Sequence, residues 1–429
     1  MTERLASVSM ASGEGEALIL EPVMKNASPP GWSQAIWIGV IDIEKLGSYK
    51  RFQLQDSSGY LRARLLVRQG AAVRGFVDVR APQGYIERLI LEEAISRLPA
   101  AAQATPNIPA RTVTVVVCTR NRTAQLRLAL SAIADLDYPD FDVLVVDNAP
   151  NNTETRDMVL QEFGRAPITL VEEPVPGLSQ ARNAGLRRAR GDIVAFTDDD
   201  VIVDRAWLRE IAAGFERAQD AACVTGLVPA GEIRSPAQHY FDKRVSWSKV
   251  VKPAIYSMAH PPENLPKFPF CPSAFGTGAN FAVNRRVASC LGGFDVALGA
   301  GTRTGGGEDI DMFTRIILAG YSLVVQPSAI VWHRHREELW ELREQARSYG
   351  SGLGAWLTKI FLDPETARVA MTRTPGVFWA ALRNIQVSRQ RQNPVDPALT
   401  GIMKLELLSI GMGPFNYLLE RRISAKADP

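Results

Sequence analysis

The chain has 429 residues, 46% of them hydrophobic and 22% charged, an ordinary composition for a folded protein of roughly two to three domains. A formal net charge of +3 gives no basic bias toward nucleic acid, and four histidines and four cysteines are too scattered for a zinc cluster. No stretch reaches the ~18 uninterrupted apolar residues of a membrane span, and the N-terminus lacks a secretory signal pattern. Cys118 and Cys223 lie in apolar runs, as buried thiols do, so we expect a reducing, cytoplasmic compartment.

The first third of the chain predicts a small accessory domain. Residues 1–33 are rich in small residues, glycine and proline, and we expect a flexible lead there. Residues 34–98 contain three runs typical of strands, AIWIGVIDI, YLRARLLVR and AVRGFVDVR, and predict a β-rich domain. Residues 99–111 have the composition of a linker. Acceptor binding and homo-oligomerisation are both open as roles of this domain.

Beyond the linker, strand patterns alternate with helical patterns. TVTVVVC (112–118) and DVLVVD (142–147) are apolar, β-branched runs typical of strands buried on both faces, with a helical pattern between them. PITLVEE, LSQARNAGLRRAR and DIVAFTD then predict a strand, a helix and a strand. This alternation predicts an α/β fold with a doubly wound, mostly parallel sheet. In such sheets ligands bind at the carboxyl ends of the strands.

Three consecutive aspartates, Asp198, Asp199 and Asp200, follow the last of these strands. Neighbouring carboxylates repel one another and are costly to desolvate, so the cluster costs folding free energy unless something offsets it. A divalent cation, which prefers oxygen ligands, would do so. A solvated acidic turn explains an isolated DDD at least as well.

Other polar residues follow the neighbouring strands of the predicted sheet. Each of them alone is explained by a turn or a helix cap. Their coincidence at one edge of the sheet favours a ligand with several polar groups, such as a nucleotide. They are Thr119, Arg120 and Asn121 after the first strand, and Asp147 and Asn148 after the second.

Two glycine-containing segments lie further along the chain. In FGTGANFAVNRR (275–286), Gly276 and Gly278 permit close approach of a ligand to the backbone, although a plain turn explains them nearly as well. In GTRTGGGEDIDMFTRIILAGY (301–321), three glycines predict a mobile loop, and Glu308, Asp309 and Asp311 open a helix. The helix macrodipole is a sufficient reason for these acids, and the alternative is a carboxylate held as a general base.

The stretch SLVVQPSAIVWHRHR predicts a strand that ends in His333 and His335. Because the two histidines are two residues apart, a strand would point both to the same face. There they could bind a metal or contact phosphate.

These motifs together resemble the family 2 glycosyltransferases of the GT-A fold. The resemblance covers about residues 112–336, and its strength comes from the order and spacing of six motifs: VVVCTRNR, VLVVDNAP, PGLSQARNAGLRRARGDIVAFTDDD, GTGANFAVNRR, GGGEDIDMFTRIILAGY and VWHRHR. It implies a nucleotide-sugar donor, a divalent metal (Mn²⁺ or Mg²⁺) and inversion of the anomeric centre by single displacement. The acceptor class stays open: a glycan, a lipid-linked molecule or a small molecule.

The resemblance also implies roles for individual residues. Asp309 matches the catalytic base, with Glu308 beside it. Asp198 and Asp200 match the outer positions of the DxD motif, with His333 or His335 completing the metal and diphosphate contacts. The nucleotide contacts are expected from Thr119, Arg120, Asn121, Asp147, Arg182, Asn183, Asp198 and Asp199, and the donor and acceptor pocket from Gly278, Asn280 and Trp332. One departure is CTRNR, where the family often has PTYNR: Arg120 replaces an aromatic residue, so a UDP-, GDP- or dTDP-sugar is equally open.

The C-terminal region, 337–429, contains apolar and basic residues in helical patterns. Packing against the catalytic domain is one explanation of its apolar residues. The alternative is an interfacial helix over 401–426, with Arg421, Arg422 and Lys426 holding the chain at an anionic membrane where lipid-linked acceptors reside.

Two other functions compete with the transferase. A sugar nucleotidyltransferase shares a similar sheet, but the first strand is followed by CTRNR and not by a glycine-rich, lysine-containing phosphate loop. A catalytically silent nucleotide- or carbohydrate-binding protein would not need both Asp200 and Asp309. Turnover of nucleotide sugars separates the three classes.

Overall fold

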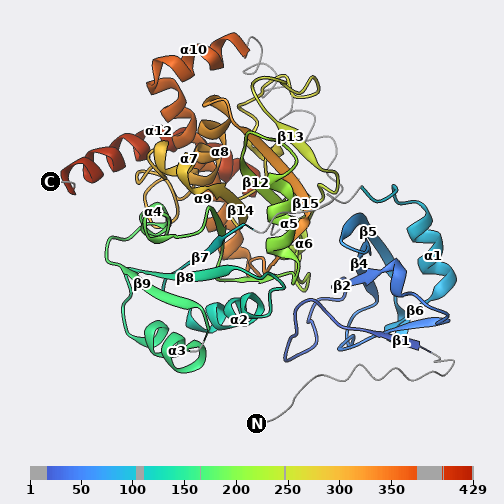
Figure 1. The fold of residues 1–429 in the computed structure, drawn as a ribbon. Coiled ribbons are helices and arrows are strands. Elements are labelled where there is room, and N and C mark those ends of the chain that lie inside the picture. The colour runs from blue at the N-terminus through green and yellow to red at the C-terminus, as the bar shows by residue number, and fades with distance from the viewer. Residues whose placement is uncertain are drawn as a thin grey trace.

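The computed structural model describes residues 17–102, 111–164, 166–245, 248–373, 399 and 401–427. Three parts are visible in Figure 1: an N-terminal unit drawn in blue, a central α/β core, and long C-terminal helices drawn in orange and red. The core is the part that positions the candidate site.

The N-terminal unit consists of two three-stranded sheets and one helix. The three predicted runs form the sheet β2 (Ile36–Asp42), β4 (Arg62–Gln69) and β5 (Ala72–Arg80). The second sheet joins β1 (Ala17–Leu20), β3 (Arg51–Leu54) and β6 (Tyr85–Glu87), and α1 (Arg88–Ser96) follows it. Strand β1 lies within the segment 1–33, where we expected only a flexible lead, and it pairs with β3.

The core contains a nine-stranded sheet in the order β11-β15-β12-β14-β10-β7-β8-β9, with β13 paired to β15. The four strands predicted from apolar runs, β7 to β10, form its parallel half. The strands are β7 (Val113–Thr119), β8 (Phe141–Asn148), β9 (Ile168–Glu173), β10 (Ile193–Thr197), β11 (Val201–Val203), β12 (Ala221–Leu227), β13 (Ala254–Tyr256), β14 (Asn280–Asn284) and β15 (Ser322–His333).

The other half of the sheet contains one parallel pair, β12 with β15, together with antiparallel pairs. β14 runs antiparallel between β10 and β12, and β11 and β13 run antiparallel to β15. The sheet is therefore mixed. The glycine-containing stretch before Asn280 returns the chain to the centre of the sheet in the reverse direction, which the helix and strand alternation alone does not reveal.

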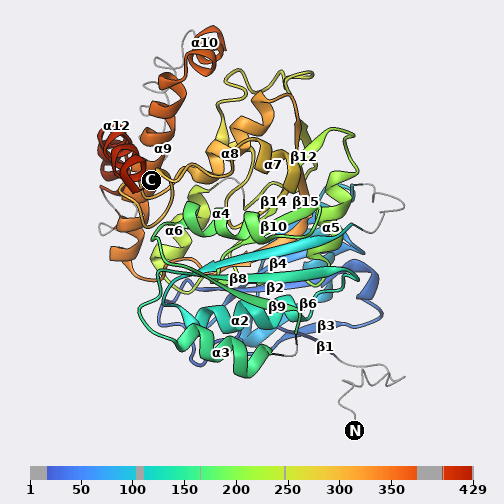
Figure 2. The same ribbon diagram turned by 60° about the vertical axis from the view of Figure 1, so that its left-hand side comes forward.

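Helices cover both faces of the sheet, as a doubly wound fold requires (Figures 1 and 2). On one face, α2 (Thr123–Ala134) buries Leu126, Leu130 and Ile133, the residues whose helical spacing predicted it. The helices α3 (Glu154–Phe163) and α5 (Trp207–Phe215) bury apolar residues in the same cluster. The opposite face is covered by α4 (Leu178–Arg188), α7 (Arg285–Cys290) and α8 (Glu308–Leu318).

The N-terminal unit and the core share an apolar cluster. Ile36 and Leu66 from the unit pack in it with Ile233 and Trp332 from the core. The Ile36 backbone N–H donates to the Ile233 carbonyl at 2.9 Å. The ion pairs Arg64–Asp242 and Arg68–Asp204, at 2.8 and 3.0 Å, join the same two parts. The N-terminal unit and the core are therefore in direct contact, although residues 99–111 between them have the composition of a linker.

The C-terminal region forms the helices α9 (Leu339–Leu362), α10 (Pro364–Arg373) and α12 (Ile402–Ala427), with α6 (Pro236–Arg244) beside their start. α9 and α12 lie side by side in Figures 1 and 2. Their backbones approach closely at Gly354 and Gly413, where a Cβ atom would have no room. Among the described helices, none is long and apolar enough to cross a membrane.

Candidate active site

The candidate site lies where the strands β7, β8 and β10 end. These strands are parallel, and β7 lies between the other two, so their carboxyl ends meet at one edge. Thr119 ends β7, Asp147 and Asn148 end β8, and Asp198 follows β10 directly. The topology therefore brings together the polar residues that the sequence places after separate strands.

The middle aspartate, Asp199, is buried and fixed by two side chains. Thr119 Oγ1 donates to Asp199 Oδ2 at 2.7 Å, and Arg122 Nη1 donates to Asp199 Oδ1 at 2.6 Å. Thr119 and Asp199, both expected at the nucleotide, thus contact each other, and their nucleotide contacts stay a prediction. We infer that Asp199 holds the turn and leaves its two neighbours free for a ligand.

The outer aspartates converge on a histidine. His333 Nε2 lies 3.3 Å from Asp200 Oδ1 and 3.9 Å from Asp198 Oδ2. This convergence follows from the sheet, because β11 runs antiparallel to β15 and pairs Val201 with His333. Arg122 Nη2 also lies 3.1 Å from Asp200 Oδ2.

The two outer carboxyls have different proton affinities. Burial and the charge of Asp200 raise the pKa of Asp198 to about 7. Burial also acts to raise the pKa of Asp200, but the positive charges of His333, Arg122 and Arg336 outweigh it and lower that pKa. Asp200 is therefore the carboxylate that stays ionised most readily, in keeping with its expected role as the direct metal ligand.

The residues present fit a hard divalent cation. One ligand atom from each of Asp198, Asp200 and His333 can be chosen so that all lie within 4.8 Å of one another. Two carboxylate oxygens and an imidazole nitrogen suit Mn²⁺ or Mg²⁺, and the Asp198 side chain is 33% exposed, which leaves an approach from solvent. A cation would also relieve the repulsion that raises the pKa of Asp198.

Arg182 connects this cluster to the helix α8. Its guanidinium is buried, donates to Glu308 Oε1 at 2.9 Å and to the Gly278 carbonyl at 3.0 Å, and lies 3.8 Å from Asp198 Oδ1. The rings of Phe281 and Phe294 pack against it. Arg182 and Glu308, expected as a donor contact and a catalytic acid, are thus paired with each other. Burial raises the pKa of Glu308 to about 7 despite the opposing charge of Arg182.

Asp309 stands in the first turn of α8, with its carboxylate turned toward Gly278. The Gly278 N–H donates to Asp309 Oδ2 at 2.6 Å, which orients the carboxylate. A Cβ atom at Gly278 would lie 2.9 Å from Arg182 Nη2 and 3.0 Å from Asp309 Oδ2, so a side chain at this position would displace at least one of these groups. The sequence suggested a glycine here for the approach of a ligand to the backbone, which stays a prediction. Asp309 is partly exposed, as a base that meets an acceptor must be.

The three glycines before α8 do not form the mobile loop that we expected. Gly305 lies against Ser348, and Gly306 and Gly307 lie against Gly352 of α9. A Cβ atom at Gly352 would be 2.6 Å from the Gly306 backbone. The glycines are needed because two backbones meet there, and the contact fixes the start of α8.

Three residues expected at the donor or acceptor have other partners. Asn183 exchanges two hydrogen bonds with the Phe294 backbone, at 2.7 and 2.8 Å. Asn280 is fully buried, accepts from Trp207 Nε1 at 2.8 Å and donates to two backbone carbonyls. Trp332 packs in the cluster shared with the N-terminal unit. These contacts give each residue a structural role, and the predicted ligand contacts of all three stay predictions.

His335 lies beyond the end of β15 and outside the group of three metal-ligating residues. Its ring is buried against the rings of His333 and Phe241, with centroids 5.2 and 4.7 Å away. Burial and the charge of His333 lower its pKa well below the usual value, so the ring stays neutral. Of the two histidines, the geometry therefore favours His333 for the metal.

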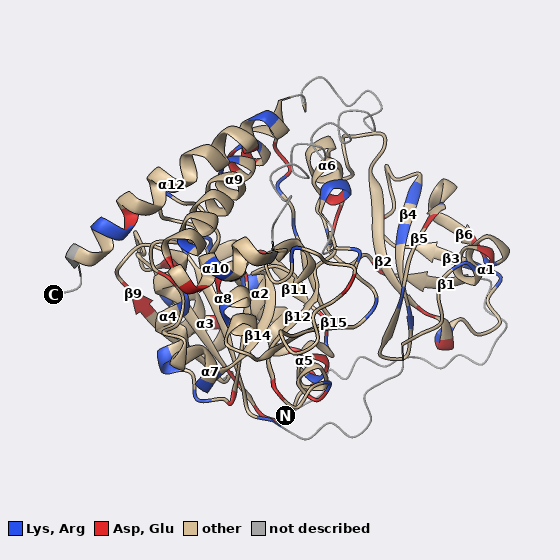
Figure 3. Cartoon of the chain, turned by 90° about the horizontal axis from the view of Figure 1, so that it is seen from above, with Lys and Arg blue, Asp and Glu red and all other residues tan. Residues whose placement is uncertain are grey.

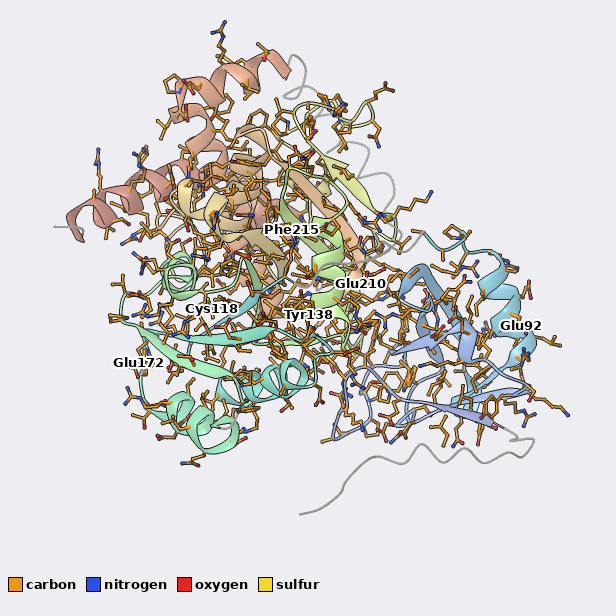
Figure 4. The ribbon with its side chains drawn as sticks, in the orientation of Figure 1. Glu92, Cys118, Tyr138, Glu172, Glu210 and Phe215 are labelled. Atoms are coloured by element: carbon orange, nitrogen blue, oxygen red, sulfur yellow. The ribbon has the colours of Figure 1, made fainter. Side chains whose placement is uncertain are left out.

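Asp147, at the end of β8, is the residue of the site that we expect to contact the nucleoside. It is buried, and its Oδ1 has no hydrogen-bond partner among the described residues. Burial and the charge of Glu172, labelled in Figure 4, raise its pKa to about 6. Arg120 and Asn121 are exposed nearby in sequence, and Asn121 accepts from the Asn151 N–H at 3.0 Å.

Cys118, also labelled in Figure 4, precedes Thr119 at the end of β7. Burial raises the pKa of its thiol to about 12. The thiol is therefore protonated at neutral pH.

Sequence reasoning missed Arg122 and Arg336. Arg122 bridges Asp199 and Asp200, and Arg336 Nη2 lies 3.8 Å from Asp200 Oδ2. Both occur inside motifs that the sequence singles out, CTRNR and VWHRHR. The signal was the presence of basic residues at strand ends that face three carboxylates, because buried carboxylates need cationic partners.

Residues 114–292 match the sequence profile described as glycosyl transferase family 2. This segment of the chain is therefore similar to the family 2 glycosyltransferases. The match covers β7 to α7, including the DxD motif, while Asp309 and His333 lie beyond it.

Known proteins similar to this chain include a pre-mycofactocin glycosyltransferase of Mycobacterium tuberculosis. It is 27% identical over 241 residues, which is 56% of this chain and 46% of that protein. The succinoglycan biosynthesis protein ExoM of Rhizobium meliloti is 31% identical over 224 residues, 51% of this chain and 65% of that protein. The chain thus spans about half of the first relative and less than two thirds of the second.

A solved structure is also similar, the mannosyltransferase PcManGT from Pyrobaculum calidifontis in complex with GDP-Man and Mn²⁺. Its TM-score is 0.45 at 21% identity, over 78% of this chain and 80% of that one.

Proposed function

We propose that this chain is an inverting glycosyltransferase that moves a sugar from a nucleoside-diphosphate donor to an acceptor hydroxyl. The proposal rests on one observation: a group of side chains that can bind a cation is linked by direct contacts to a carboxylate that can act as a base. The proposed cation-binding group, Asp198, Asp200 and His333, is joined through Arg182 and Gly278 to the partly exposed carboxylate of Asp309. The family match supports a sugar-transfer reaction for this arrangement.

The cation-binding group suits the nucleotide-sugar donor, and Asp309 suits the acceptor hydroxyl. A cation held by Asp198, Asp200 and His333 would supply Lewis-acid stabilisation of the diphosphate leaving group. Asp309 would accept the proton of the acceptor hydroxyl as that oxygen bonds to the anomeric carbon and the bond to the diphosphate breaks. Arg182 and Glu308 position these ends relative to each other. Attack from the side opposite the diphosphate inverts the anomeric centre.

Calorimetric titration with UDP, GDP and dTDP tests the donor class and the cation requirement. At least one nucleotide should bind in Mn²⁺ or Mg²⁺ and lose most of its affinity in chelator, because the diphosphate and the carboxylates repel each other without the cation. Equal binding in chelator would contradict the proposed cation site.

Asp147 predicts a pH dependence of nucleotide binding. If its carboxylate accepts a hydrogen bond from the nucleoside, protonation below its pKa of about 6 removes the acceptor. Affinity should then fall by ~10-fold for each pH unit below 6, as one competing proton requires. Because a nucleotide phosphate titrates near the same pH, the measurement is the difference between the wild type and Asp147→Asn. The variant should bind more weakly at pH 7.5 and show a flatter profile, whereas parallel profiles would remove Asp147 from the site.

The outer face of α12 favours a membrane as a further partner. Six apolar residues of this helix are between 40% and 73% exposed: Leu407, Leu408, Met412, Phe415, Leu418 and Ile423. Basic residues stand at both ends of the helix, as Figure 3 shows, and Lys404, Arg421 and Arg422 among them are exposed. The acids of the helix point inward instead, Glu406 toward Arg244 and Glu420 toward Arg303. An apolar strip between cations fits an anionic lipid surface.

Liposome sedimentation tests this partner. Changing Lys404, Arg421 and Arg422 to glutamine should weaken binding to anionic vesicles by roughly 100-fold, at about 1 kcal/mol for each basic residue. Phe415→Asp should weaken it as well, because the aspartate replaces inserted apolar surface.

The matched control changes Lys50, Arg62 and Arg80, exposed basic residues of the N-terminal unit, to glutamine. It removes the same charge far from α12 and should bind like the wild type (Figure 1). Equal weakening by the control would mean that net charge, and not the face of α12, causes the binding.

A further inference from the structure

A cavity of about 170 Å³ lies between the N-terminal unit and the core. One wall consists of strand β2 and the segment 22–29 from the unit. The other wall consists of Gly231, Glu232 and Arg234 from the core. None of the residues that line it belongs to the candidate active site, so the cavity needs its own explanation.

Glu232 is a cavity-lining residue with a carboxylate oxygen that lacks a hydrogen-bond donor among the described residues. It is only 5% exposed, and its Oε1 accepts from Gln238 Nε2 at 3.1 Å, with Arg334 Nε 3.5 Å away. Its Oε2 is buried and has no hydrogen-bond partner among the described residues. Leaving a buried carboxylate oxygen unpaired costs about 1–3 kcal/mol or more, so a donor from a ligand would stabilise this site.

The other lining residues restrict the chemistry of that ligand. Trp37 and Tyr60 contribute aromatic side chains, and Met24 and Ile36 contribute apolar surface. Arg234, the lining guanidinium, already donates to the Ser28 carbonyl at 2.9 Å. With Glu232 and Asp56 as the two lining carboxylates, an anionic nucleotide or phosphate is disfavoured. A neutral molecule with hydroxyl donors and an apolar face fits best, which is the chemistry of a saccharide.

We propose that this cavity is a second saccharide-binding site, distinct from the donor site, in which sugar hydroxyls donate to Glu232. The choice of a saccharide among neutral polyols rests on the proposed function, since a glycosyltransferase meets saccharides as parts of its acceptor. The site gives the N-terminal unit a role in acceptor binding, which the sequence left open against oligomerisation.

The cavity wall is also hydrogen-bonded to the strand that carries the metal-ligating histidine. The Gly231 N–H donates to the His333 carbonyl at 2.9 Å, and Gln238 Nε2 donates to both Glu232 and the His335 carbonyl at 3.1 Å. A sugar bound to Glu232 would therefore contact a segment that is hydrogen-bonded to the carbonyls of His333 and His335.

Saturation-transfer NMR on the full chain in chelator tests the site without turnover. The probes are methyl α-mannoside, methyl β-glucoside, methyl β-galactoside and methyl N-acetyl-β-glucosaminide, each at tens of millimolar. At least one should give signals with the wild type and with Asp200→Asn, which disables the cation site. Glu232→Gln should weaken its binding by ~10-fold, the effect of losing a charge-assisted hydrogen bond.

A second variant keeps the test independent of Glu232. Ala27 lines the cavity and is exposed, so Ala27→Trp should block the cavity without disturbing the core, and Ala71→Trp at an exposed turn is the matched control. Signals that disappear in Ala27→Trp and persist in Ala71→Trp support the proposal. Signals that disappear only in Asp200→Asn would place the sugar at the transferase site and overturn it, as would no signal from any probe. The nucleotide titrations decide the proposed function separately.

Discussion

Replacing Asp309 by asparagine should lower the turnover rate by ~100-fold or more, the usual scale of general base catalysis. Asparagine keeps the size of the side chain, and its carbonyl oxygen can still accept from the Gly278 N–H, which holds Asp309 at 2.6 Å. It cannot accept the proton of the acceptor hydroxyl. Donor affinity should stay near the wild-type value, because the cation-binding group consists of other residues.

The control for this variant is Asp157→Asn. Asp157 is also in the first turn of a helix, α3, so its replacement removes a comparable interaction with a helix dipole away from the site. It should leave turnover unchanged. Near-normal turnover of Asp309→Asn with a good acceptor would show that its carboxylate only starts the helix, and Glu308 and Asp311 would then be tested.

Replacing Asp200 by asparagine should act on binding first. Asp200 is held ionised by His333, Arg122 and Arg336, and its loss removes a charged cation ligand. Cation and donor affinity should fall by at least ~10- to 100-fold, since even outer-shell partners of metals contribute that much. Turnover should be lost under ordinary conditions and recover partly at high metal and donor concentrations.

Asp192→Asn is the matched control, because Asp192 is an exposed aspartate just before the same strand, β10. Calorimetry with Mn²⁺ and the nucleotide that binds best measures both variants. Wild-type cation affinity in Asp200→Asn would remove this residue from the metal group.

The parallel half of the sheet could be predicted because the residues of each strand themselves show a strand pattern. The runs at 113–119 and 141–148 are apolar and β-branched, and Leu126, Leu130 and Ile133 repeat at helical spacing between them. The antiparallel strand β14 has no such signal. Its position between β10 and β12 depends on pairing with segments far away in the sequence, which periodicity does not report.

The candidate site was predictable where residue type is tied to chemistry, and less so where tertiary contacts decide. The sheet brings Asp198, Asp200 and His333 together as predicted. Asn280 is of a residue type that often contacts ligands, but here its side-chain amide accepts from Trp207 and donates to two backbone carbonyls. The glycines at 305–307 have the composition of a mobile loop, but Gly352, from a helix outside the motifs, packs against them.

The central claim is that this chain transfers a sugar from a nucleotide donor with Asp309 as the base. Its most direct test follows nucleoside diphosphate release and the anomeric configuration of the product by NMR. A panel of UDP-, GDP- and dTDP-sugars is used, with Mn²⁺ and a glycan acceptor mixture, for the wild type and Asp309→Asn. We predict that at least one donor is consumed in a cation-dependent reaction, with inverted configuration and a rate ~100-fold or more lower in the variant. Nucleotide binding without turnover of any donor, or a product of retained configuration, would contradict the claim.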